Sequence, residues 1–136
     1  MPNPRPEYPR PILRRDRWLN LNGQWDFAAD PDGVGVSERW QNRTEWPSAI
    51  TVPFAPNSAA SGCTVDPDVQ RVWYHRSFDN PNWQGEEVIL NIGACDFITT
   101  VFVNGHAVGS HTGGYSPIKL NITAALQAGE NHLAIK

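Results

Sequence analysis

Cysteine is scarce in this sequence: its two cysteines, Cys63 and Cys95, lie far apart along the chain. Neither belongs to a C-x-x-C pair or to a cysteine–histidine spacing typical of zinc sites, so we expect no metal centre. Nothing in the sequence points to an oxidising compartment, where disulfides persist. We therefore predict two free thiols and keep a Cys63–Cys95 disulfide as the alternative.

A long apolar run and a strong charge imbalance are also missing. No stretch of about 18 apolar residues is present, so no helix is expected to cross a bilayer. The formal net charge of −3 is not concentrated in blocks, which argues against nucleic acid or a membrane surface as a partner. Residues 1–7 lack the apolar region of a signal peptide, so the sequence predicts a cytoplasmic location.

Several motifs that carry enzyme chemistry are absent as well. The sequence has no G-x-S-x-G nucleophile elbow, no Walker loop and no G-x-G-x-x-G fingerprint. The histidines are not spaced as metal ligands. They are His75, His106, His111 and His132. The sequence therefore predicts neither a cofactor nor a metal site.

What the sequence does contain is a succession of short β patterns. Within residues 72–78, Val72 and Tyr74 alternate with Trp73 and His75, as in a strand whose two faces differ. Further strands are expected over 24–28, 50–52, 88–92, 97–103, 106–109, 118–122 and 131–136. Short strands at regular spacing with almost no helix, in a chain the length of one domain, predict an antiparallel sandwich or barrel.

Turn signals separate these strands. Asn104-Gly105 is the strongest two-residue hairpin signal, and it predicts a type I′ turn with positive φ at both residues. Thr123 is expected to cap a short helix over 124–127, and Gly129 to end that helix in the left-handed conformation. The loop over 54–68 is long enough for a functional role.

The two ends of the chain carry different signals. Residues 1–13 include five prolines, which predict an extended arm, and the folded domain is expected over 14–136. The last strand pattern begins at Asn131 and has no turn signal after it. We therefore expect this chain to be a fragment of a longer one, marginally stable because a sheet edge is left uncovered.

Several motifs, in this order, also resemble those of a known family. They are Trp18–Phe27, Ile50–Phe54, Val72–Arg76, Gly93-Ala94, Val103-Asn104-Gly105, Gly113-Gly114-Tyr115-Ser116-Pro117 and Asn121-Ile122-Thr123. The pattern is similar to the N-terminal sugar-binding domain of glycoside hydrolase family 2, which includes β-galactosidases, β-glucuronidases and β-mannosidases. It spans Arg10 to Lys136.

This resemblance implies a fold and a function. The fold would be an all-β jelly-roll sandwich like the galactose-binding domain, truncated at its C-terminal side. The parent protein would hydrolyse O-glycosyl bonds of β-linked sugars, and this piece would pack on its (β/α)8 barrel and middle sandwich domain. Because the family's catalytic glutamates lie on that barrel, the piece alone is expected to be inactive. Its neighbouring carboxylates, Asp66 with Asp68 and Glu86 with Glu87, are expected on the surface.

Two other classes of function stay open. A freestanding carbohydrate-binding module has the same fold without an attached enzyme, and so does a purely structural or adhesive sandwich. Exposed aromatic side chains would favour the carbohydrate-binding module, because a sugar ring stacks on an exposed aromatic ring. Trp18, Trp25 and Trp73 lie in or beside strand patterns and are expected in the core or packed between a sheet and a loop. The others, Trp40, Trp46 and Trp83, are candidates for a sugar platform or an interdomain contact.

Asp96 is the polar residue that stands out, because it lies at the bend between two apolar strands. One interpretation is a turn residue that bonds its own backbone. The other makes Asp96 a substrate-binding residue that reaches the active-site rim of a neighbouring catalytic domain together with Asn57 and Ser58. In some β-galactosidases of the family, the loop that holds the equivalents of these two residues contacts substrate. No catalytic residue is expected within this chain.

Overall fold

The computed structural model describes residues 4–6, 17–83 and 85–136. Its strands are β1 (Gly23–Ala29), β2 (Ser48–Val52), β3 (Val72–Asp79), β4 (Ile89–Ile92), β5 (Ile98–Val103), β6 (His106–Thr112), β7 (Ile118–Asn121) and β8 (Glu130–Ile135). Its short 3-10 turns are η2 (Trp40–Asn42), η3 (Ala59–Ser61) and η4 (Thr123–Ala125). The arm predicted over 1–13 lies almost entirely outside the described residues.

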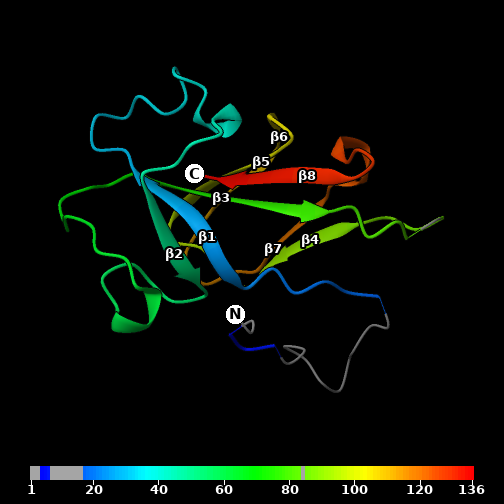
Figure 1. Ribbon diagram of the computed structural model, residues 1–136, viewed down its shortest axis with the longest axis horizontal. Coiled ribbons are helices and arrows are strands. Elements are labelled where there is room, and N and C mark those ends of the chain that lie inside the picture. The colour runs from blue at the N-terminus through cyan, green and yellow to red at the C-terminus, as the bar shows by residue number, and fades with distance from the viewer. Residues whose placement is uncertain (1–3, 7–16, 84) are drawn as a thin grey trace.

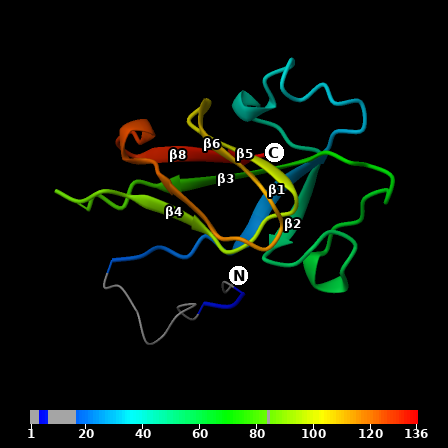
Figure 2. The same cartoon turned by 180° about the vertical axis from the view of Figure 1, so that it is seen from behind.

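The strands form two antiparallel sheets, seen from opposite sides in Figures 1 and 2. One has six strands in the order β2-β1-β3-β8-β5-β6, and the other pairs β4 with β7. The predicted all-β sandwich is confirmed. The six-stranded sheet joins strands from both ends of the chain, because β8 pairs with β3 on one side and with β5 on the other.

The main core fills the space between the two sheets. Trp25 and Phe27 project into it from β1, Val101 from β5 and Leu90 from β4. Alternation along each strand puts these side chains on one face and the polar ones on the other. Burying each of them stabilises the fold by about 1.5–3 kcal/mol. The predictions for Trp25 and Trp73 are confirmed, since both are buried, whereas Trp18 is only half-buried.

A second apolar cluster lies on the outer face of the six-stranded sheet. Trp73 stacks on Phe102 with ring centroids 5.6 Å apart, and Trp40 lies 6.0 Å from Trp73. The loop between β1 and β2, drawn in cyan in Figure 1, carries Trp40 and Trp46 over this face. Both indoles are therefore partly covered, and the guanidinium of Arg43 lies 4.7 and 5.0 Å from their rings. Trp40 and Trp46 do not form an open sugar platform.

The hairpin between β5 and β6 has the predicted turn. Asn104 has φ of 51° and Gly105 has φ of 84°, and His106 pairs with Val103. The carboxamide of Asn104 also donates to the Ala125 carbonyl at 2.9 Å. This bond ties the turn to η4. The return strand that starts over 106–109 continues in β6 as far as Thr112, which pairs with Ile98 of β5.

The prediction of a helix over 124–127 capped by Thr123 is wrong. The structure has a 3-10 turn that begins at Thr123 and lacks a side-chain cap. The Thr123 hydroxyl is engaged elsewhere: it accepts from the Val88 amide at 2.8 Å and donates to Asn121 Oδ1 at 2.7 Å. Extended Leu126 follows the turn, and Gly129, with φ of 78°, lies just before β8 instead of ending a helix.

Candidate functional site

A cavity of about 450 Å³ opens at the end of the sandwich where β3 and β5 begin. One wall consists of Gln70, Arg71 and Val72, at the start of β3. The opposite wall comes from the start of β5 and the turn before it: Asp96, Phe97, Ile98 and Thr100. Lys136 completes the lining. Two cationic side chains and one carboxylate thus surround a partly apolar cavity.

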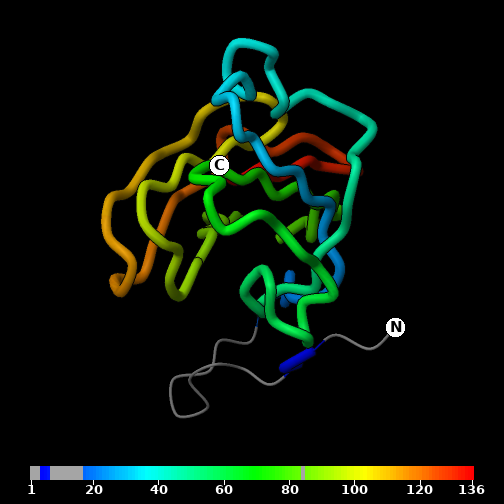
Figure 3. The backbone as a smooth tube through the Cα atoms, turned by 90° about the vertical axis from the view of Figure 1, so that its left-hand side faces the viewer, coloured from blue at the N-terminus to red at the C-terminus, as the bar shows by residue number. Residues whose placement is uncertain are grey.

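Asp96, the first of the predicted site residues, lines this cavity and is exposed. Its carboxylate lies against Gly114 of the β6–β7 loop. That loop and the β4–β5 turn lie side by side in Figure 3, joined by a 2.7 Å hydrogen bond from the Gly113 amide to the Phe97 carbonyl. Within the described part of the chain, Asp96 accepts no bond from its own turn, so its carboxylate is free to meet a partner.

Apolar side chains are exposed around the same corner. The exposed fraction is 58% for Phe97, 70% for Ile98 and 100% for Tyr115. Exposed apolar groups that gather in one place mark sites of contact with another protein surface or a ligand. Sequence reasoning missed this grouping, because Tyr115 is far from Phe97 along the chain. The pairing of β5 with β6 and the Gly113–Phe97 hydrogen bond bring the loop of Tyr115 beside the turn of Phe97.

Asn57 and Ser58 serve a different role. Asn57 Oδ1 accepts from the Val65 amide at 2.7 Å, and the Ser58 hydroxyl donates to the Ala55 carbonyl at 2.6 Å. Both side chains therefore hold the loop that follows β2 in shape. Neither lines the cavity of Asp96. The structure thus does not bring the three predicted residues together in one cavity.

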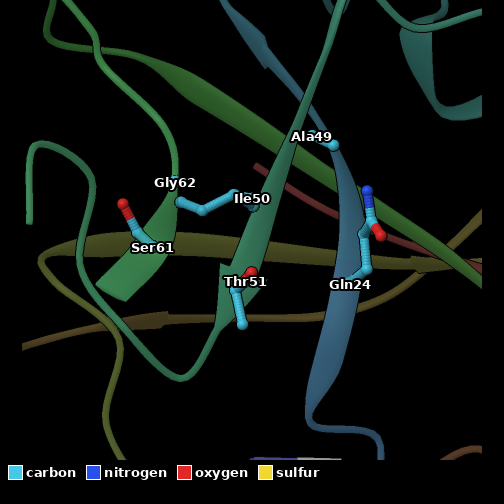
Figure 4. Close-up of a pocket in the computed structure, with 6 residues that line it drawn as sticks. All are labelled: Gln24, Ala49, Ile50, Thr51, Ser61 and Gly62. Atoms are coloured by element: carbon cyan, nitrogen blue, oxygen red, sulfur yellow. The ribbon is translucent and has the colours of Figure 1, made fainter. Parts of the chain in front are cut away.

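A smaller cavity of about 190 Å³ lies beside that loop, between β2 and η3. Figure 4 shows Gln24 and Thr51 on neighbouring strands, with Ser61 and Gly62 across from them. Of these side chains, Ser61 already donates to the Ser58 carbonyl at 2.8 Å. The cavity has no charged lining residue and offers little chemistry beyond hydrogen bonding.

The neighbouring carboxylates lie on the surface, as predicted. Asp66, Asp68, Glu86 and Glu87 are all exposed. Asp66 accepts from the Asp68 amide at 2.9 Å, and Glu86 pairs with Arg17 at 3.4 Å. Glycoside hydrolysis needs two carboxyl groups that face each other across one bond. These pairs point into solvent and cannot act in this way.

The structure also forms a row of titratable side chains that sequence reasoning missed. His75 Nδ1 lies 2.8 Å from Asp26 Oδ2, and His75 Nε2 lies 3.1 Å from His132 Nδ1. At the far end, His132 Nε2 lies 3.2 Å from Glu130. Trp46 stacks on His75 with centroids 5.3 Å apart. Asp26, His75 and His132 come from three strands that are adjacent only in the sheet, so no local spacing reveals them. Among the described residues, no group of three or more such side chains could hold a metal ion.

Two cysteines and a largely buried tyrosine lie near one another in the core region. Cys63 is buried, Cys95 is half-buried, and neither forms a disulfide. Burial raises the pKa of Tyr74 to about 12, with smaller contributions from Cys95 and Cys63. The described residues also include no helix with the length and apolar character of a membrane span.

Comparisons with known proteins agree with this architecture. Residues 18–136 match the family described as glycosyl hydrolases family 2, sugar binding domain. A β-glucuronidase of Paenibacillus borealis is 33% identical over 131 residues, which cover 94% of this chain and 22% of that protein.

Solved structures are also similar over 85% of this chain. Among them is a β-glucuronidase from an uncultured Clostridium, with a TM-score of 0.73 and 28% identity; this chain covers 21% of its length. Another is the β-glucuronidase of Ruminococcus gnavus in complex with D-glucuronic acid, with a TM-score of 0.71 and 28% identity; this chain covers 20% of its length. The chain therefore spans about a fifth of the length of the proteins that it matches.

Proposed function

The chain belongs to glycosyl hydrolase family 2, whose sugar-binding domain it matches, and we propose that it serves as the noncatalytic domain of a β-glucuronidase. The parent protein hydrolyses the O-glycosyl bond of β-linked glucuronides. The observation that carries this proposal is the match, over nearly the whole chain, to β-glucuronidases that are about five times longer. The catalytic acid and nucleophile then belong to the remaining four fifths of the parent.

In this proposal the domain packs against the catalytic barrel and the middle sandwich domain of the parent. The exposed side chains of Phe97, Ile98 and Tyr115 support such packing, because water-exposed apolar groups are stabilised when another domain covers them. Asp96 at the same corner has a free carboxylate, which suits it to accept a hydrogen bond from a sugar hydroxyl at the rim of the shared pocket.

The test compares the parent with this chain alone. We expect the parent to hydrolyse nitrophenyl β-glucuronide faster than the β-galactoside or β-mannoside, and residues 1–136 to turn over none of them. Replacing Asp96 by Asn in the parent should raise KM, whereas Asp66→Asn, at an exposed carboxylate away from the cavity, should leave it unchanged. Turnover by the chain alone, or a parent that prefers galactosides, would refute the assignment.

The second candidate is a freestanding carbohydrate-binding module, favoured by the family's sugar-binding description. The two candidate functions predict different affinities of this chain for free sugars. A pocket that needs walls from a barrel should bind free sugars at millimolar Kd or worse, about 4 kcal/mol or less, whereas a module should reach micromolar Kd. Titration calorimetry with glucuronic acid, galactose and mannose decides between them. The cytoplasmic location stays a prediction.

A further inference from the structure

Four titratable side chains form a continuous row on the outer face of the six-stranded sheet: Asp26, His75, His132 and Glu130. His75 of β3 lies opposite Asp26 of β1 in the strand register, and its Nδ1 is 2.8 Å from the Asp26 carboxylate. His132 and Glu130 lie on β8, at the other side of β3. His132 Nδ1 is 3.1 Å from His75 Nε2, and His132 Nε2 is 3.2 Å from Glu130. Each of the four ring nitrogens therefore faces a partner in this histidine row.

Two neutral imidazoles do not satisfy the histidine row. Each neutral ring carries one N–H, so the pair brings two protons to three contacts. Carboxylates are ionised near neutral pH and only accept. One contact then always places a lone pair against a lone pair, either between the two rings or between His132 and Glu130. The first arrangement leaves His75 unsatisfied at a position that is 8% exposed, where an unmade hydrogen bond is most unfavourable.

One additional proton satisfies every contact of the row. His75 Nδ1 then donates to Asp26, His132 Nε2 donates to Glu130, and the third proton lies between the two rings. A fourth proton would place two N–H groups of two cationic rings against each other at 3.1 Å. The geometry therefore fits three protons on the four ring nitrogens, which is one positive charge shared by His75 and His132.

The charges around the row favour one positive charge and oppose a second. Asp26 lies at one end and Glu130 at the other, where Asp79 of β3 pairs with Glu130 in the strand register and adds a third carboxylate. Arg43, on the loop between β1 and β2, lies 5.0 Å from the Trp46 ring that covers His75 and would repel a second charge. β2, β5 and η2 carry no charged residue. The other charged side chains of the loop and of the packed strands are Asp30, which is bonded to Trp73, the exposed Asp32, Glu38, Arg39 and Glu45, and Arg76, which lies on the core face of β3.

Trp46 connects this charge to the loop. Its indole stacks on His75 with centroids 5.3 Å apart and an angle of 13° between the rings. The indole N–H is buried and has no hydrogen-bond partner among the described residues, so the position of Trp46 depends on ring contacts. A cation within about 6 Å of an indole ring is attracted by its face. The proton of the histidine row therefore strengthens the stack that holds the loop on the sheet.

We propose that the histidine row is a pH-sensitive switch: it holds one proton beyond those of two neutral rings, and this shared proton fastens the β1–β2 loop to the sheet through Trp46. When the row loses this proton, one contact becomes repulsive and the stack loses its cation. When the row gains another, the two rings repel each other. The inference concerns the fold of this chain and does not rest on the proposed enzymatic activity.

The effect on stability has a definite sign on each side. Free imidazoles take up their protons between about pH 8 and 5. At the upper end of this range the two rings are neutral in the unfolded chain while the folded row keeps its proton, so stability falls as pH rises. At the lower end the unfolded rings bind two additional protons and the folded row binds one, so stability falls as pH falls. The row therefore stabilises the fold most between these limits.

Glu130→Gln tests the proton count directly. A Gln carboxamide keeps the shape of Glu130 but donates to His132 Nε2, so every contact of the row is satisfied while both rings are neutral. Glu87→Gln is the matched control, because Glu87 is an exposed carboxylate outside the row. NMR of 15N-labelled histidine then follows the protons on each ring between pH 8 and 5 in the wild type and both variants. The exposed His106 is the internal reference.

In the wild type, His75 and His132 should titrate with one common midpoint and take up one proton between them, whereas His106 takes up a proton of its own. The indole N–H signal of Trp46 should shift with the same midpoint. Glu130→Gln should move this midpoint down by about half a pH unit or more, and Glu87→Gln should not. Four results would each overturn the proposal: separate protonation of the two rings, no proton uptake by the row, a Trp46 signal that does not follow the titration, or equal behaviour of the two variants.

Discussion

The carboxylate of Asp30 organises the loop that covers the outer face of the large sheet, and replacing it should loosen that loop. Asp30 is 1% exposed. Its oxygens accept from the amides of Val34 and Gly35, both at 2.9 Å, and from the Trp73 indole at 3.3 Å. A Cβ on Gly35 would collide with that indole, so the loop, carboxylate and ring fit closely.

Asp30→Asn keeps the shape and removes the charge. The amide nitrogen of Asn would face at least one of the three donors, and the remaining bonds would lose their charge assistance. A hydrogen bond to a charged group contributes about 1.5–3 kcal/mol. The three hydrogen bonds share one carboxylate, and Asn keeps one acceptor oxygen. We therefore expect the free energy of unfolding to fall by about 3 kcal/mol. With an unfolding entropy typical of 136 residues, this lowers Tm by about 10 °C.

The pH dependence gives the sharper test. Burial alone would raise the pKa of Asp30, but the bonds from Gly35, Val34 and Trp73 outweigh it, so its pKa is lowered. A lowered pKa contributes stability above the unfolded-state pKa of about 4, and this stability is lost as pH falls through the folded value. The difference in unfolding free energy between wild type and Asp30→Asn should therefore be constant from pH 7 to 5 and shrink below pH 4.

Urea unfolding followed by tryptophan fluorescence measures this difference. Asp32→Asn, at an exposed carboxylate of the same turn, is the matched control and should change stability little. An Asp30→Asn protein as stable as wild type at pH 7, or one whose deficit is the same at pH 3, would refute the reasoning.

Two further predictions concern the hairpin and the core tyrosine. Gly105→Val should lower the free energy of unfolding by more than about 1 kcal/mol in thermal melts, because a Cβ at φ of 84° is strained and would meet the Asn42 side chain. Ala107→Val on β6 is the control, and equal melting temperatures of the two variants would contradict this prediction. Absorbance titration at alkaline pH should resolve one phenol that ionises at about pH 12, and Tyr74→Phe should remove that transition; its persistence in the variant would assign it elsewhere.

Local patterns were sufficient for the strands and the hairpin. Alternation within residues 72–78 predicted which side chains of β3 share a face, and Asn104-Gly105 predicted its turn. The prediction for Thr123 was wrong because a hydroxyl can accept a hydrogen bond either from its own turn or from a distant amide. Here it accepts from the amide of Val88, 35 residues away. Asn57 and Ser58 carried no local signal that their side chains would hold the loop instead of facing a ligand.

The sequence by itself determined the all-β class, the hairpin and the family, because these depend on side-chain period, on backbone sterics at two residues and on motifs read in order. Only the tertiary structure decided what lies next to what. It aligned His75 with His132, brought the β6–β7 loop against Phe97, and opened a cavity between Val72 and Ile98. The physical reason is that strand pairing joins residues tens of positions apart, and its register depends on the packing of the whole sheet and not on any one segment.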